Sequence, residues 1–142
     1  MEADVPVGRG RTLMRHGRFG VDVSRPDGLV FVRTANRERV VDWYREAVGC
    51  DVWLEQPGCT ILARGDFRFG LCDADEGDTE TDGILTFVRP DRAGVDRLHD
   101  RVGDAAREAP HVNERYDIYQ FFADDPDGRT VEVQTFLHEL PE

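Results

Sequence analysis

The chain repeats one pattern of elements, and this repeat limits its fold more than any other feature. Twice, an apolar run precedes a segment of helical period that ends in Val-Gly, and the tripeptide Phe-Val-Arg occurs in both leading runs. Short apolar segments separated by turn residues follow each helix. We expect strands at 29–33, 50–56, 59–64 and 67–72, and again at 84–89, near 105–114, at 118–123 and at 129–137. The sequence therefore predicts an α+β domain built from two βαβββ modules.

The predicted domain spans residues 28–138, with modules at about 28–73 and 83–138. Residues 1–27 are rich in Gly and Arg without an apolar period, and we expect them to be a flexible N-terminal extension. The acidic stretch 73–82 is predicted to be a solvated linker. A calcium-binding loop needs glycine at its sixth position and glutamate at its twelfth. Counted from Asp73, those positions hold Asp78 and Ile84.

The charge of the chain indicates its surroundings. It has 29 acidic and 18 basic residues, a net charge of -11, and every basic residue is arginine. Such an excess of carboxylates repels itself unless concentrated salt screens it, so we expect a halophilic protein of an acidic proteome. The same charge argues against nucleic-acid partners. No apolar run has membrane-spanning length and no signal-peptide pattern opens the chain, so we expect a cytoplasmic protein without a membrane partner.

Three cysteines, Cys50, Cys59 and Cys72, lack the spacing of a metal finger. If Gly65-Asp66 forms a two-residue hairpin turn, Cys59 lies opposite Cys72. Two interpretations follow: a redox pair, or two packed free thiols. A reducing cytoplasm favours the free thiols.

Two segments carry a resemblance to a known family: Trp43-Tyr44-Arg45-Glu46-Ala47-Val48-Gly49, and Asp125-Pro126-Asp127-Gly128-Arg129-Thr130-Val131-Glu132-Val133. Together with the duplication, they resemble the vicinal oxygen chelate (VOC) superfamily of glyoxalase I, bleomycin-resistance proteins and extradiol dioxygenases. The resemblance covers roughly residues 28–138. It implies that each sheet curls into a half-barrel, that the helices cover the outside, and that the concave faces form the ligand site. By analogy with two-module members, it also implies a symmetric homodimer.

In metal-dependent members of that superfamily, His or Glu ligands stand on the first and last strands of each module. The matching positions here are Leu29, about Gly70, Ile84 (or Leu85, if the repeat is registered on Phe-Val-Arg) and Glu132. Glu132 alone is a metal-binding residue type, and one carboxylate does not hold a metal against water. The four histidines, His16, His99, His111 and His138, share no i, i+4 or i, i+2 spacing. We therefore expect no metal or other cofactor.

The last two strands predict the ligand face. A type I turn over Asp125–Gly128 would place Phe121 opposite Glu132 and Tyr119 opposite Gln134, with Phe136 on the same side. On the first strand, Phe31 and Arg33 share a face. Arg33 and Arg68 are the expected cations beside Glu132. The predicted ligand-binding residues are Phe31, Arg33, Tyr119, Phe121, Glu132, Gln134 and Phe136.

These residues favour a metal-free protein that holds a small organic ligand in an aromatic-lined cavity, with Glu132 as polar anchor. The alternative is a divalent-metal-dependent lyase, isomerase or dioxygenase of the glyoxalase/dioxygenase type. A metal-free enzyme with Glu132 as general base, and a structural or regulatory module with a filled cavity, also stay open.

Overall fold

The structure, a computed structural model, describes residues 26–142. The prediction of a flexible extension falls almost wholly outside them. The first module holds β1 (Val30–Thr34), α1 (Arg37–Trp43), the π-helical turn η1 (Tyr44–Val48), β2 (Asp51–Gln56), β3 (Cys59–Arg64) and β4 (Phe67–Asp73). The second holds β5 (Ile84–Val88), α2 (Arg92–Val102), the 3₁₀ turn η2 (Gly103–Ala105), β6 (His111–Asn113), β7 (Ile118–Asp124) and β8 (Thr130–Phe136).

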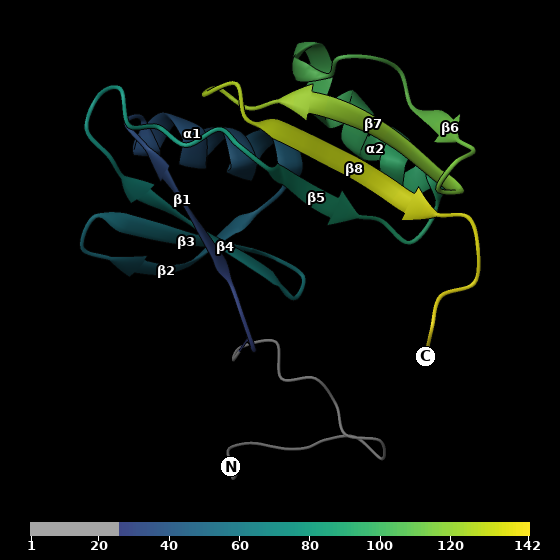
Figure 1. Cartoon of the computed structure of the whole chain (residues 1–142), viewed down its shortest axis with the longest axis horizontal. Helices are drawn as coiled ribbons and strands as arrows, with labels where there is room; N and C mark the ends of the chain where they lie inside the picture. The colour runs from purple at the N-terminus through teal and green to yellow at the C-terminus, as the bar shows by residue number, and fades with distance from the viewer. Residues whose placement is uncertain (1–25) are drawn as a thin grey trace, which may run out of the picture.

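Each module forms one four-stranded sheet, and the two sheets have the same topology. Their strand orders are β1-β4-β3-β2 and β5-β8-β7-β6, with the first strand of each module parallel to the last and the other neighbours antiparallel. Figure 1 shows the two sheets side by side, with α2 lying against β7 and β8. The predicted α+β fold of two βαβββ modules is confirmed. The strand expected near 105–114 is much shorter than predicted, because η2 and a loop occupy most of that range.

The helix ends follow local rules in all but one place. Gly49 ends the first helical segment with φ 85°, a left-handed conformation that glycine adopts without a steric penalty. Asp91 caps α2 by accepting from the Gly94 amide at 2.7 Å. Asn36 precedes α1 but makes no capping bond; its side-chain amide donates instead to Asp127 at 3.2 Å. A contact with the distant hairpin thus replaces the expected cap.

Both modules contribute to one hydrophobic core. Helix α1 packs on β3 and β4, α2 packs on β7 and β8, and η1 contacts α2. The ring of Phe87 lies 5.5 Å from that of Phe67, 5.8 Å from that of Phe69 and 6.3 Å from that of Tyr44. These contacts join β5 to the first module. Because the helices cover one face of each sheet, the other face is left open, and there the site residues lie.

The acidic linker is hydrogen-bonded to the first module along β1. The Ala35 amide donates to the Thr79 hydroxyl, and the Arg33 amide donates to a carboxylate oxygen of Glu80, both at 2.9 Å. The Glu80 amide in turn donates to the carbonyl of Arg33 at 2.9 Å. Most of this segment is exposed, and at Thr79 and Glu80 it satisfies main-chain groups on the outer edge of β1.

Within residues 26–142, no helix combines the length and the apolar character needed to cross a membrane.

Candidate functional site

Glu132 lies on the open face of the second sheet, as the alternation of β8 predicts. Its neighbours Val131 and Val133 are fully buried in the core. Glu132 itself is partly exposed on the opposite face. The strand thus presents one carboxylate to the surface that the helices leave uncovered.

Polar side chains from three other strands hold that carboxylate. Thr86 on β5 donates its hydroxyl to Oε1 of Glu132 at 2.9 Å, and Gln120 on β7 donates its amide to Oε2. Asn113 on β6 donates to the side-chain oxygen of Gln120 at 2.8 Å. We call Asn113, Gln120, Thr86 and Glu132 the Glu132 network. Because it spans all four strands of the sheet, it fixes the carboxylate in position.

The pairing predicted around the last hairpin is wrong by one residue. Glu132 lies opposite Phe122 instead of Phe121, and Gln134 lies opposite Gln120 instead of Tyr119. The Asp125 amide donates to the carbonyl of Arg129, so three residues form the loop, and Gly128 adopts φ 85°. A type I turn followed by a left-handed glycine adds one residue to the loop and shifts the register.

This shift moves two predicted ligand-binding residues to the other face of the sheet. Phe121 is fully buried in the core, and its ring meets that of His99 at 4.9 Å. Tyr119 donates its hydroxyl to Asp96 on α2 at 2.7 Å, and this bond raises the pKa of the phenol. Phe122 and Gln120, which the sequence pattern did not reveal, take their places. The only signal was Gly128, whose position at the end of the turn favours a left-handed conformation.

Gln134 and Phe136 lie on the Glu132 face, as expected. They follow Glu132 at alternate positions of β8, and both are partly exposed. Phe122, opposite Glu132, is also partly exposed. The open face therefore combines one carboxylate, three amides (Asn113, Gln120 and Gln134) and two aromatic rings.

On the first sheet, Phe31 lies on the open face and covers Gly70. The two residues are direct partners between β1 and β4, and Phe31 is 50% exposed. A Cβ atom at position 70 would lie 2.5 Å from the Phe31 ring, so only glycine fits under it. Phe31 and Phe87 begin the two copies of the repeated Phe-Val-Arg tripeptide, but they are not structurally equivalent. Phe31 lies on the open face, whereas Phe87 lies in the core and is 3% exposed.

The positions that bear metal ligands in the resembled superfamily do not fit a metal in this chain. The Phe31 ring covers Gly70, and Ile84 on the Glu132 side is an apolar residue, 55% exposed. Leu85, the alternative position on β5, belongs to the core. Among residues 26–142, no group of three or more His, Cys, Asp or Glu side chains is placed to hold a metal ion. The oxygens of Glu132 accept from protein donors instead.

The two arginines expected beside Glu132 lie on the first sheet. Arg33 is the neighbour of Cys72 in the ladder and binds Glu80 through its main chain. Arg68 donates to the carbonyl of Gly65 at 2.7 Å, and its guanidinium lies 5.2 Å from the centre of the Trp53 ring. In the part of the chain that the structure describes, no arginine forms an ion pair with Glu132. Neutral donors hold the carboxylate in its place.

A buried polar network joins the two modules beneath the last hairpin. Asp125 accepts from the Tyr44 hydroxyl at 2.7 Å and from the Arg129 guanidinium at 2.6 Å, and all three side chains are almost fully buried. Burial and the Asp125 carboxylate both raise the pKa of Tyr44. Burial lowers the pKa of Arg129, but the charge and hydrogen bond of Asp125 outweigh it, so the net shift is upward. Arg129 also donates to the linker carbonyl of Glu80.

Cys59 and Cys72 form a disulfide between β3 and β4. Their predicted pairing is confirmed, but the expectation of two free thiols is wrong. Directly opposed residues of an antiparallel pair bring their sulfurs within bonding reach, and here the Cα atoms are 4.1 Å apart. Cys50 is the free cysteine of the described residues. Its burial raises the pKa of its thiol to about 12.

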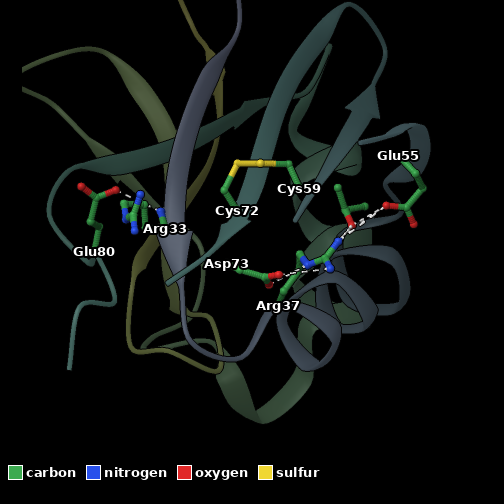
Figure 2. Close-up of a disulfide and its surroundings, with 8 residues drawn as sticks. Arg33, Arg37, Glu55, Cys59, Cys72, Asp73 and Glu80 are labelled. Carbon is green, nitrogen blue, oxygen red and sulfur yellow. Dashed lines mark hydrogen bonds and ion pairs between the residues drawn. A yellow bond between two sulfur atoms is a disulfide. The ribbon is translucent and has the colours of Figure 1, made fainter. Parts of the chain in front are cut away.

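The helical side of the first module carries an open groove of about 620 Å³ between α1 and β2–β4. Arg37 lies in it and donates to Asp73 at 2.8 Å and to the Thr60 hydroxyl at 3.0 Å (Figure 2). Thr60 donates onward to Glu55 at 2.7 Å. The carboxylates of Asp73 and, at 3.8 Å, Glu55 thus compensate the charge of Arg37.

No protein-family model matches the sequence, and no curated protein is similar to it by sequence. Solved structures, however, share its fold. A glyoxalase/bleomycin resistance protein/dioxygenase family enzyme from Burkholderia phytofirmans PsJN is 18% identical over 82% of this chain and 100% of its own, with a TM-score of 0.65. A lactoylglutathione lyase from Agrobacterium tumefaciens is 22% identical over 78% of this chain and 95% of its own, with a TM-score of 0.62. The chain therefore has the VOC fold.

Proposed function

We propose that this VOC-fold protein binds a small organic molecule without a metal, on the open face of the second sheet. The Glu132 network carries the proposal. This carboxylate accepts from two neutral donors, has no cationic partner among the described residues, and has lone pairs left to accept from a ligand. The ligand is therefore expected to bring a hydroxyl, amine or amide donor.

The surroundings of Glu132 define the rest of that ligand. Phe122 and Phe136 offer aromatic surface, and Gln134 adds one amide two residues further along β8. Apolar walls with a few convergent polar groups are typical of sites for small, partly apolar molecules. The proposed ligand has an apolar body that contacts the rings and a donor group that reaches Glu132.

The metal-dependent alternative has less support. It rests on the likeness to glyoxalase and dioxygenase structures, whose identity to this chain is low. At the superfamily's ligand positions this chain offers one carboxylate, and that carboxylate is already hydrogen-bonded.

The test compares ligand binding by wild type and Glu132→Gln, which keeps the size of the side chain and removes its charge. A library of small amines, alcohols and amides would be screened by thermal shift, and hits measured by calorimetry. A hydrogen bond to a charged group contributes about 1.5–3 kcal/mol, so we expect binding to weaken about ten- to hundredfold. Glu114→Gln is the matched control, since it removes an exposed charge from the β6–β7 loop.

Two results would contradict the proposal. A ligand bound equally by wild type and Glu132→Gln would show that Glu132 is structural. Added Mn²⁺, Zn²⁺ or Ni²⁺ that stabilises wild type but not Glu132→Gln, together with stoichiometric metal in elemental analysis, would favour the metal-dependent alternative.

A further inference from the structure

We propose that the Cys59–Cys72 pair is a thiol–disulfide exchange site for low-molecular-weight thiols. The pair lies on the open face of the first sheet, together with Ile61, Gly70 and Phe31. The residues next to the two cysteines, Thr60 and Leu71, are buried on the other face. Both cysteines are partly exposed and lie outside the main core. A small thiol can therefore approach both residues from solvent without opening the core.

The disulfide connects strands that are already firmly paired. Six consecutive residue pairs join β3 to β4, and five more join β4 to β1. Figure 2 shows the bond lying directly across two adjacent strands. Because hydrogen bonds hold β4 on both sides, the covalent bond adds no connection that the sheet lacks. Its opening should leave the fold intact, as an exchange site requires.

The exchange proceeds in two balanced steps. The thiolate of one small thiol attacks the sulfur of Cys59 or Cys72, the S–S bond breaks, a mixed disulfide forms and the other cysteine leaves as a thiolate. A second small thiol attacks the mixed disulfide and releases a small-molecule disulfide. The protein gains two electrons and two protons in total, and two small thiols are oxidised. The reverse sequence, with the small-molecule disulfide as oxidant, restores the bond.

Cys50 serves as an internal control for the reactivity of Cys59 and Cys72. It is 3% exposed and its thiol has a pKa of about 12, so little thiolate forms at neutral pH. Cys59 and Cys72, once reduced, should react with an alkylating agent in the folded protein, whereas Cys50 should react only after unfolding.

The experiment treats the full oxidised chain, in molar KCl, with reduced glutathione, quenches with iodoacetamide and maps the labelled cysteines by mass spectrometry. We expect Cys59 and Cys72 to be labelled and Cys50 not, with an unchanged circular dichroism spectrum and closure of the bond by oxidised glutathione. The native protein should react no more than about tenfold slower than the protein in urea. If reduction required global unfolding, only the unfolded fraction of the molecules would react. The native protein would then be reduced roughly 10³-fold or more slowly than the protein in urea.

Three variants keep the result decisive. Cys72→Ser has no second thiol to resolve an adduct, so oxidised glutathione should leave a stable mixed disulfide on Cys59, and Cys59→Ser should do the same on Cys72. Cys50→Ala should exchange as wild type does. Native reduction a thousandfold slower than in urea, or reduction accompanied by loss of the folded spectrum, would show a structural disulfide and overturn the proposal.

Discussion

Removal of the Asp125 carboxylate should destabilise the protein far more than removal of an exposed carboxylate. Oδ2 of Asp125 accepts from Tyr44 and Arg129, and Oδ1 accepts from the amides of Asp127 and Arg129 at 2.9 and 3.0 Å. Asp125→Ala leaves all four donors without this acceptor. It also leaves the guanidinium of Arg129, 1% exposed, without its closest countercharge.

The size of the effect follows from burial. Removal of one partner from a buried ion pair costs about 3–5 kcal/mol, since the other charge stays desolvated. For a chain of this length, that lowers the melting temperature by about 10–17 °C. Tyr44→Phe removes one buried hydrogen bond to a charged acceptor and should cost about 1.5–3 kcal/mol. Tyr119→Phe also removes a 2.7 Å hydrogen bond from a tyrosine hydroxyl to a carboxylate, here Asp96. Because this bond is exposed, its loss should cost less than about 1 kcal/mol.

Urea unfolding followed by circular dichroism, in molar KCl, measures all three variants. A loss of less than about 1 kcal/mol in Asp125→Ala, or equal stability of Tyr44→Phe and Tyr119→Phe, would refute a stabilising role of the buried network. Either result would mean that the buried network contributes no more than a surface ion pair.

Three further predictions concern the net charge, the oligomeric state and the buried thiol of Cys50. Because the net charge is -11, the free energy of unfolding should rise from low to molar KCl, and equal stability at both salt levels would contradict a halophilic origin. Phe31, Ile84 and Val88 are about half exposed on the open faces, so we expect a symmetric homodimer; light scattering in molar salt should give twice 16.1 kDa, and a mass of 16.1 kDa would count against it. Burial raises the pKa of Cys50 from 9.0 to about 12, so its contribution to stability is complete below pH 9 and is lost as the pH rises towards 12. Above pH 9, the free energy of unfolding, measured in urea, should fall with pH less steeply in Cys50→Ala than in wild type, by about 1.4 kcal/mol per pH unit. Parallel pH profiles of the two proteins would show that ionisation of Cys50 does not affect stability.

The sequence by itself determined the features that depend on local periodicity. The duplicated order of strands and helices, the helix ends at Gly49 and Gly103, and the orientation of Glu132 away from the core all follow from apolar spacing within one segment. The opposition of Cys59 and Cys72 also followed, because a two-residue turn fixes the register of its hairpin.

Tertiary structure decided how these elements meet. The left-handed conformation of Gly128 added one residue to the last loop, exchanged Phe121 for Phe122 opposite Glu132, and brought Gln120 to the carboxylate. The packing of Phe31 over Gly70 also depends on strand register, here that of β1 against β4. Side chains alternate between the two faces of a strand, so one residue of register decides which of them form the site. The register of the last hairpin depends on the conformation of its loop, and the β1–β4 register depends on contacts between distant segments. The spacing of apolar residues reveals neither.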